Sequence, residues 1–227
     1  MKQKLCFFLG DITRSGGTER VASQIANALA GDGAYDVCLL SLVEQNKAPF
    51  YPIDPAIPRY SLGERWIKPG PGYLPLIGKL RTFLREKNID VVIDVDIVLD
   101  VLSLPAARFL GTKVISWEHF NAEFELSVGY RRWILRYSLP RSDYVVVLTK
   151  ADRDVYRDRL GRRERIAQIY NPLDKSDEAY DPHRKKQIVS VGRLVPQKGI
   201  DKLMRIAATV LRAHPDWQWL LLGEGEE

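Results

Sequence analysis

Short apolar runs alternate with amphipathic stretches along most of the chain. The first such unit consists of 4–9, 18–30 and 36–43. In its middle stretch Val21, Ile25 and Leu29 recur every four residues, which predicts a helix with one buried face. The spacing is that of a strand, a crossover helix and a parallel strand.

The same alternation continues to about residue 170. Further strands are predicted at 57–61, 90–95, 113–117, 143–148 and 166–170, and helices at 73–87, 99–110, 129–139 and 150–160. Six prolines interrupt the pattern within 46–72, where we expect an irregular excursion. Strands that alternate with helices indicate an α/β fold with a doubly wound, Rossmann-like parallel sheet.

The pattern restarts after a polar connector. We expect a first domain at 1–172, a linker at 173–184 and a second Rossmann-like domain at 185–227, with strands at 187–191 and 217–222 around a helix at 200–213. About 40 residues are too few to cover both faces of a sheet. The second domain is therefore expected to be incomplete, as in a fragment of a longer protein.

Composition narrows the class of protein. The chain has 227 residues, of which 45% are apolar and 28% are charged, as in an ordinary globular protein. Only Cys6 and Cys38 could pair, and both lie in apolar runs, so we expect reduced, buried thiols and no disulfide framework. No apolar run approaches the length of a membrane span or signal peptide, which favours a cytoplasmic location.

The positive charge is concentrated in one segment. The net charge is +5, yet 131–165 alone holds eleven Arg and Lys against five Asp and Glu. Either this is a solvated helical face or it binds anionic lipid, with Trp133 and Tyr137 interleaved among Arg131, Arg132, Arg136 and Arg141. Nucleic acid is not favoured, because no recognition motif accompanies the charge.

Ligands of open parallel sheets bind outside the carboxyl ends of the strands, and four loops qualify. In the first, 10–19, Gly16 and Gly17 precede a helix whose start could hold a phosphate. The glycines could equally serve only the turn. Their spacing is not GxGxxG, which disfavours a nicotinamide-dependent dehydrogenase.

The second loop follows the strand at 113–117 and carries Glu118, His119 and Asn121. These side chains lie where a substrate is expected. Asp94 and Asp96, near the end of another strand, could bond sugar hydroxyls or could simply cap a turn.

The third and fourth loops belong to the second domain. Gly192, Arg193 and Lys198 lie on a loop before a predicted helix, where two cations and a helix N-terminus suit a diphosphate. Gly223 and Gly225 follow the next strand and allow a nucleotide to approach the backbone. No zinc-ligand spacing, GxSxG elbow or Walker phosphate loop occurs, so we expect no metal and no bound cofactor.

These residues together resemble a known family. Gly16-Gly17-x-Glu19 before a helix, Glu118-His119 after a strand, Asn171-Pro172 at the domain junction, Gly192-Arg193-x4-Lys198-Gly199 and Gly223-Glu224-Gly225 are similar to the family-4 glycosyltransferases of the GT-B fold. In that family two Rossmann-like domains face each other across a cleft, with the acceptor on the first and the sugar nucleotide on the second.

The resemblance implies a role for each of these residues. Arg193 and Lys198 would hold the leaving diphosphate of a donor such as a UDP- or GDP-sugar, together with Gly192, Gly223 and Gly225. Gly16 and Gly17 would approach the diphosphate or the transferred sugar, and His119 would contact that sugar near its anomeric carbon. Glu118, Asn121 and Asp96 would face a glycan or polyprenyl-linked acceptor. Transfer would retain anomeric configuration and require no metal, as in bacterial cell-surface polysaccharide synthesis.

One departure from the family pattern matters. The Glu-x7-Glu motif of the second domain is absent downstream of Lys198, so we expect no turnover by these residues alone. Two alternatives remain open: a sugar-nucleotide epimerase of the same architecture, and a non-catalytic sugar-nucleotide-binding or partner subunit.

Overall fold

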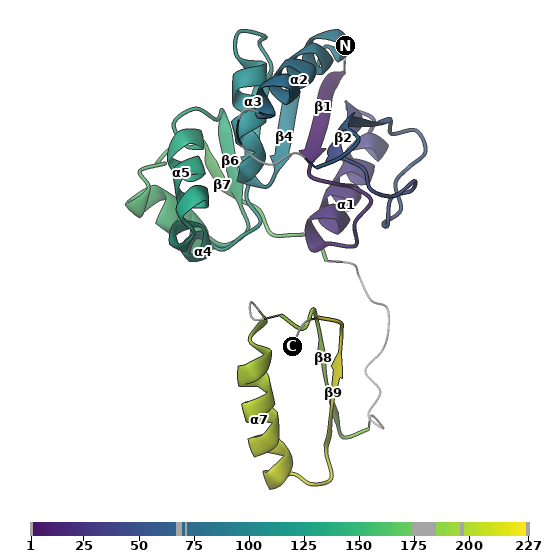
Figure 1. Cartoon of the computed structure of the whole chain (residues 1–227), viewed down its shortest axis with the longest axis vertical. Coiled ribbons are helices and arrows are strands. Elements are labelled where there is room, and N and C mark those ends of the chain that lie inside the picture. Colours follow the sequence, from purple (N-terminus) through teal and green to yellow (C-terminus); the bar gives the residue numbers. More distant parts are fainter. Residues whose placement is uncertain (1, 67–69, 71, 174–184, 196–197, 226–227) are drawn as a thin grey trace. The chain divides into compact units, whose positions relative to one another are not determined.

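A computed structural model describes the chain except for residues 1, 67–69, 71, 174–184, 196–197 and 226–227. It divides into two compact units, Met1–Leu173 and Asp174–Glu227, which are described separately (Figure 1). Apart from Leu173, the predicted linker at 173–184 lies outside the described residues.

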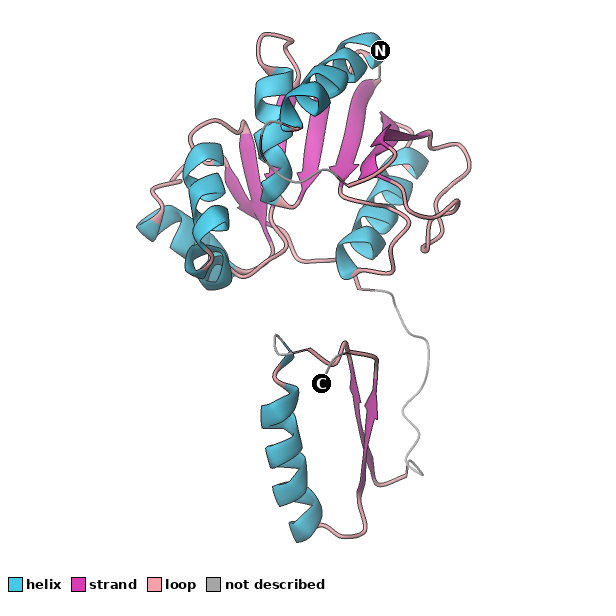
Figure 2. Ribbon diagram, in the orientation of Figure 1, coloured by secondary structure: helices cyan, strands magenta, loops and turns pink. Residues whose placement is uncertain are grey.

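The first unit alternates strands and helices along its whole length (Figure 2). Its strands are β1 (Gln3–Leu9), β2 (Tyr35–Val43), β3 (Arg59–Gly63), β4 (Val91–Val95), β5 (Lys113–Trp117), β6 (Tyr144–Val147) and β7 (Ile166–Gln168). Its helical elements are α1 (Gly17–Gly31), α2 (Tyr73–Lys87), the 3-10 turn η1 (Ile97–Leu99), α3 (Asp100–Ala107), α4 (Ala122–Ser127), α5 (Gly129–Ser138), α6 (Lys150–Asp154) and the π-helical turn η2 (Val155–Arg159).

The seven strands form one parallel sheet in the order β3-β2-β1-β4-β5-β6-β7. The chain builds outward from β1 through β2 to β3, then returns to the other side of β1 with β4. The direction of winding therefore reverses between β1 and β4. In sheets of this kind the loops after these two strands diverge and leave a crevice at the carboxyl edge.

The two faces of the sheet bury alternate side chains of the same strands. Phe8 of β1 packs in a cluster with residues of α2 and α3, whereas Phe7 packs on the opposite face with residues of α1. Fully buried strands of this kind must be apolar on both faces, as β1 is. A third cluster joins α5 to β6 around Leu135 and Tyr156. The predicted Rossmann-like α/β fold is confirmed.

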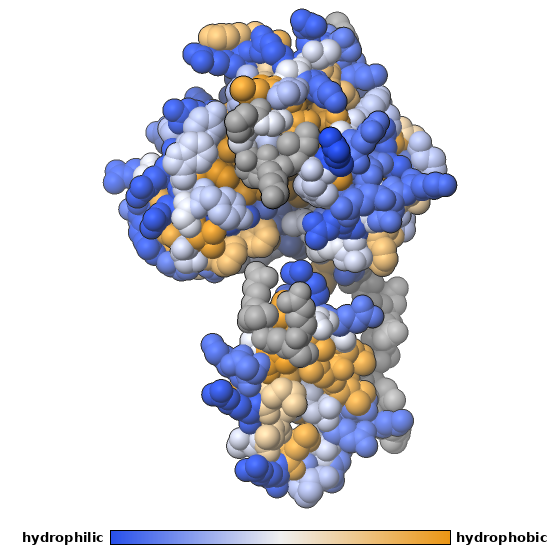
Figure 3. Space-filling model, viewed as in Figure 1, coloured by the Kyte–Doolittle hydropathy of each residue, from blue (hydrophilic) through white to orange (hydrophobic). Residues whose placement is uncertain are grey.

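The second unit is small. Strands β8 (Gln187–Val191) and β9 (Gln218–Leu222) are parallel and are joined through α7 (Ile200–Ala213). The exposed positions of the two strands alternate and include Val189, Val191, Leu220 and Leu222. Hydrophobic side chains accordingly gather over this unit's surface (Figure 3). Within the described residues the sheet of the second domain is incomplete, as the sequence predicts.

Three elements differ from the predictions. Helix α4 at 122–127 was not expected, and the helix predicted at 150–160 changes to a π-helical turn at Val155. The helix predicted at 99–110 is preceded by η1 and ends at Ala107. No described helix is both long and apolar enough to cross a bilayer.

The burial of α2 generates a test of the core. Leu80 is 0% exposed in the cluster beneath α2, whereas Leu74 on the same helix is 70% exposed. We expect Leu80→Ala to lower the free energy of unfolding of the first unit by about 2–5 kcal/mol, because it leaves a cavity. Leu74→Ala should change it by less than about 0.5 kcal/mol. Denaturant unfolding followed by near-UV circular dichroism measures both, and equal losses would contradict the packing described.

Candidate functional site

The loop between β1 and α1 is braced by a buried aspartate that sequence reasoning passed over. Asp11 is fully buried; its Oδ1 accepts hydrogen bonds from the Thr13 N–H (2.8 Å) and hydroxyl (2.5 Å), and its Oδ2 accepts from Gln45 N (3.2 Å). Gly10 lies close to Trp66, since a Cβ at position 10 would be 3.2 Å from the Trp66 ring, which would have to shift slightly. The loop is thus held at the carboxyl end of β1.

The start of α1 is already occupied by a carboxylate. Gly16 is the N-cap and Gly17 the first helical residue, and neither offers a side chain to cap the free N–H groups. Glu19 turns back instead: a Cβ on Gly16 would lie 2.1 Å from Glu19 Oε2, which also accepts a hydrogen bond from the Thr18 hydroxyl. A negative charge here satisfies the positive end of the helix dipole and disfavours a phosphate at the same place.

His119 lies just after β5, at the carboxyl edge of the sheet, as predicted. Its ring contacts that of Trp117 at a centroid distance of 4.4 Å, and its Nε2 atom is buried with no hydrogen-bond partner among the described residues. Burial lowers the pKa of His119 to about 4. At neutral pH the imidazole is therefore uncharged and has one ring nitrogen unsatisfied.

Two neighbours of His119 are placed differently from the prediction. Glu118 is 1% exposed, and its Oε1 accepts a hydrogen bond from Phe120 N, so it does not face an acceptor as expected. Asn121 is exposed but serves as the N-cap of α4, where its Oδ1 accepts from the N–H groups of Glu123 and Phe124. The side-chain oxygens of both residues therefore accept hydrogen bonds from nearby backbone N–H groups, which stabilises the turn after β5 and the start of α4.

The two aspartates of β4 also differ from each other. Asp94 lies within the strand rather than after it; it is fully buried and accepts a hydrogen bond from the Ser103 hydroxyl. It is therefore structural. Asp96 follows β4 with a φ of 100°, caps η1 through the Val98 N–H, and forms an ion pair with Arg131 at 2.9 Å. Asp96 alone of the two reaches the carboxyl edge.

A network of buried acids lies beneath these loops. Besides Asp96, its carboxyl groups are those of Asp94, Asp100, Glu118 and Glu125. Burial raises the pKa of each of them, that of Asp100 to about 6 and those of Asp94 and Glu118 well above the usual range. Burial thus favours the uncharged form of these carboxyl groups, as expected for acids removed from water.

Arg131 provides the positive charge of this network. Burial alone would lower its pKa, but Asp96 and Glu125 raise it above the usual value, and its guanidinium also lies over the Phe120 ring at 4.4 Å. We had expected Arg131 to be one of the lipid-facing cations. That prediction is wrong, because its side chain is only 7% exposed.

The other basic residues of α5 do face solvent. Arg132 and Arg136 are exposed on one stripe of the helix, and Tyr130 and Trp133, each 62% exposed, lie on the next. Trp133 stacks on Tyr137 at 5.7 Å. An exposed helix face that combines aromatic and cationic side chains is typical of a membrane-surface contact.

In the second unit the two predicted cations share one loop. Arg193 and Lys198 are exposed on the segment between β8 and α7, and neither has an ion-pair partner among the residues described. Gly199 caps α7 with a φ of 65°, a left-handed conformation that favours glycine. Lys198 lies directly before this N-cap residue, and Arg193 lies earlier on the same loop, directly after Gly192.

Gly223 and Gly225 are required by backbone packing. A Cβ on Gly223 would lie 1.8 Å from Gly192 O, and one on Gly225 would lie 1.8 Å from Leu194 O. Leu194 N also donates to Glu224 O at 2.8 Å. The two strand-end loops therefore lie against each other, and the glycines position the loop that carries Arg193.

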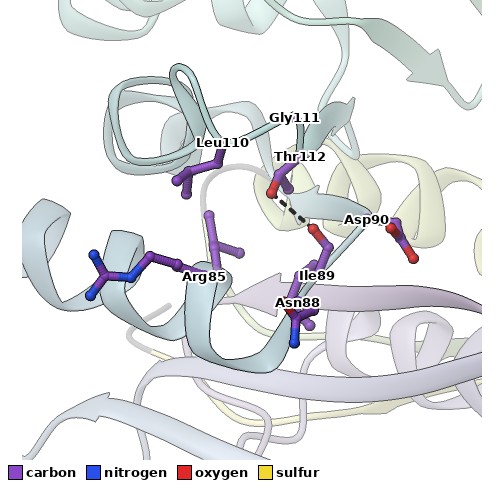
Figure 4. A pocket seen from close by; sticks show the side chains of 8 residues that line it. Arg85, Asn88, Ile89, Asp90, Leu110, Gly111 and Thr112 are labelled. Carbon is purple, nitrogen blue, oxygen red and sulfur yellow. Dashed lines mark hydrogen bonds between the residues drawn. The ribbon is translucent and has the colours of Figure 1, made fainter.

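The hollow in Figure 4 lies elsewhere. It has a volume of about 330 Å³ and is lined by residues 84–85, 88–90 and 110–112, at the amino ends of β4 and β5. Thr112 donates to Ile89 O across it at 2.8 Å. Because ligands of parallel sheets bind at the carboxyl ends, we do not assign this hollow to the site. Within the described residues no group of His, Cys, Asp and Glu side chains is arranged to hold a metal ion.

Comparison with known sequences finds a matching family and several relatives. The sequence profile of Glycosyltransferase Family 4 matches residues 15–177. An uncharacterized glycosyltransferase of Haemophilus influenzae is 33% identical over 99% of this chain, and the amylovoran biosynthesis glycosyltransferase AmsD of Erwinia amylovora is 28% identical over the same share. The chain spans 63% of the length of each of these two relatives.

Solved structures show the same fold at low identity. Anabaena Alr3699/HepE, solved in complex with UDP and glucose, is 18% identical and superimposes with a TM-score of 0.67 over 97% of this chain and 61% of its own. TarM superimposes with a TM-score of 0.73 at 11% identity, over 100% of this chain and 72% of its own.

The burial of His119 predicts an unusual titration. We expect a midpoint of about 4 in a side-chain NMR titration, assigned with His119→Gln. Because an exposed histidine titrates near 6.5, the folded protein binds fewer protons than the unfolded chain between these values. The stabilisation is therefore complete above pH 6.5 and is lost as the pH falls toward 4.

The same burial has a measurable effect on stability. Between pH 7 and pH 5 the first unit should lose about 2 kcal/mol more unfolding free energy in the wild type than in His119→Gln, at about 1.36 kcal/mol per pKa unit. Equal losses in the two proteins, or a midpoint above 6, would show that the ring is solvated.

Proposed function

The chain belongs to glycosyltransferase family 4, and from this membership we propose that the protein moves a sugar from a nucleotide-sugar donor to a glycan or lipid-linked acceptor with retention of anomeric configuration. The similarity to an amylovoran biosynthesis enzyme supports a place in bacterial cell-surface polysaccharide synthesis. We propose a UDP- or GDP-sugar as donor. The activity, donor and acceptor of the whole protein are parts of this proposal.

The loop between β8 and α7 is the observation that carries it. Arg193 and Lys198 are exposed and have no ion-pair partner among the described residues, and Lys198 lies two residues before the first residue of a 14-residue helix. A departing nucleoside diphosphate carries concentrated negative charge, and preorganised cations stabilise that charge as it develops. Arg193 can bond two oxygens at once, while Lys198 supplies a compact charge.

The first unit would supply contacts to the transferred sugar. His119 is uncharged at neutral pH, so it can donate or accept a hydrogen bond with a hydroxyl without bringing a charge to the reacting carbon. The carboxylate of Glu19 beside Gly16 disfavours a diphosphate there. We therefore place the glycine loop at the sugar rather than at the diphosphate.

The acceptor side of the proposal rests on Asp96 and Asn121. Both lie at the carboxyl edge of the sheet. The Asp96 carboxylate can accept a hydrogen bond from a sugar hydroxyl, and the Asn121 amide nitrogen can donate one while its Oδ1 caps α4. Glu118 is left out, because it is buried beneath the loop.

A lipid-linked acceptor would make contact with the cytoplasmic membrane surface useful. The exposed face of α5 presents Arg132 and Arg136 next to Tyr130 and Trp133. Each basic residue near an anionic surface contributes about 1 kcal/mol, so a few suffice for reversible binding. We propose that this face holds the protein peripherally at the membrane.

Binding of the nucleotide tests the role of the loop. We expect Lys198→Ala to weaken the affinity for UDP or GDP by about tenfold or more, because a hydrogen bond to a charged group contributes about 1.5–3 kcal/mol. Arg212→Ala removes an exposed cation from the last turn of α7, at the far end from Lys198, and should leave the affinity within twofold. Isothermal titration calorimetry measures both.

The outcomes separate the alternatives. In an enzyme that turns over, Lys198→Ala should lower kcat/KM by about a hundredfold or more, and NMR of the product reports its anomeric configuration. Equal affinities in the wild type, Lys198→Ala and Arg212→Ala would remove Lys198 from the site. Epimerised donor without a transfer product would favour the epimerase alternative, and an inverted product would contradict retention.

The membrane contact has its own test. The double substitution of Arg132 and Arg136 by Gln should reduce partitioning onto phosphatidylglycerol vesicles by about 30-fold, since two basic residues together contribute about 2 kcal/mol. The same substitution of Arg205 and Arg212 on α7 is the charge-matched control and should have little effect. Equal retention of the wild type by anionic and neutral vesicles in cosedimentation would leave α5 as a solvated helix face.

A further inference from the structure

Arg131 joins three separate parts of the chain. From α5 its guanidinium donates to Asp96 at the end of β4 (2.9 Å) and to Glu125 of α4, and it lies over the Phe120 ring in the turn after β5 (4.4 Å). Asp96 and Phe120 flank the carboxyl ends of neighbouring strands. One buried side chain thus connects both loops of the proposed acceptor side.

Asp96 occupies an important position in the sheet. It is the first residue after β4, and β4 pairs with β1 where the direction of winding reverses. Its backbone has a φ of 100° and a ψ of 124°, which a residue with a side chain rarely adopts. Such conformations cost about 1–3 kcal/mol and persist only where neighbouring groups enforce them.

The contacts of Asp96 show what enforces this conformation. Its Oδ1 accepts hydrogen bonds from both Val98 N (3.1 Å) and Arg131 Nη2 (2.9 Å), and its N–H donates to Trp117 O (3.0 Å). Neither side-chain bond uses Oδ2. The carboxylate is 18% exposed, so it retains access to solvent while Arg131 is almost fully buried.

We propose that Arg131 is a positioning residue for the transfer reaction, holding the Asp96 carboxylate at the switch point of the sheet so that it can accept a hydrogen bond from an acceptor hydroxyl. This inference rests on the proposed function and extends it to a residue that does not itself touch the substrate. Within the described residues, Arg131 is the only cation that forms ion pairs with this acidic network, so no other side chain can replace it.

The inference predicts a loss confined to the acceptor. In the active enzyme, with UDP-glucose or UDP-galactose as donor and octyl glucoside or octyl galactoside as acceptor probe, Arg131→Met should raise the acceptor KM at least tenfold. The donor KM should stay within twofold. Arg131→Lys, which keeps a charge but loses the forked geometry, should recover part of the acceptor affinity.

A matched pair of variants separates positioning from simple loss of structure. Asp96→Ala and Glu125→Ala each remove one carboxylate partner of Arg131, but only Asp96 lies at the carboxyl edge. Asp96→Ala should reproduce the acceptor defect, while Glu125→Ala should keep the acceptor KM within about threefold. If Arg131→Met does not fold, the difference in acceptor KM between Asp96→Ala and Glu125→Ala tests the inference by itself.

Three results would overturn the inference. They are an acceptor KM within twofold of the wild type in folded Arg131→Met, an equal rise in donor KM, and an equal acceptor defect in Asp96→Ala and Glu125→Ala. A wild-type enzyme that neither transfers sugar to these glycosides nor hydrolyses any donor in a panel of UDP- and GDP-sugars would overturn the proposed function itself, and the inference with it. A failure seen only in the variants concerns Arg131 alone.

Discussion

The parallel pairing of β1 with β4 is the constraint on which the rest of the first unit depends. Because β2 and β3 add to one side of β1 and β4 to β7 add to the other, the loops after β1 and β4 turn away from each other. Every strand ends at the same edge, so the glycine loop, Asp96 and His119 all reach it although they are distant in sequence. No hydrogen bond between side chains is needed to bring these segments to one edge.

Beneath that edge the chain buries more carboxyl groups than it can pair. The free-energy cost of burying an ionised carboxylate without a partner exceeds the net stability of a folded domain. Such a group therefore either forms an ion pair or has its pKa raised so that the protonated form is favoured. Asp96 and Glu125 form ion pairs with Arg131, whereas burial and neighbouring acids raise the pKa values of Asp94 and Glu118 and so favour their uncharged forms.

In the second unit the position of the loops depends instead on close contact between two backbone segments, those that follow β8 and β9. Its strand-end loops touch at Gly192 and Leu194 on one side and at Gly223 and Gly225 on the other. Because no side chain fits between them, the glycines fix the backbone on both sides of Arg193 without contributing a functional group. The family's glycine pattern in this chain is thus explained by packing as much as by space for a ligand.

The sequence by itself determined the order and type of nearly all elements. Apolar periodicity is a local property, and it located α2 at 73–87 and β5 at 113–117 with the bounds that the structure has. It also placed His119, Arg193 and Lys198 at strand ends, since the carboxyl-end rule needs only the chain direction. Helix α4 was missed because it is short, although Asn121 followed by two glutamates in the first turn was an available signal.

Only the tertiary structure decided which polar residues are buried and paired and which retain unpaired atoms at the carboxyl edge. Glu118 and His119 are neighbours in sequence, yet one is buried beneath the turn and the other retains an unsatisfied nitrogen at the edge. Arg131 lies in a basic stretch and seemed one more surface cation, but α5 turns it inward toward two carboxylates from other elements. Such pairings join residues up to 35 positions apart, and no local pattern encodes them, because burial and charge compensation arise only when the elements pack together.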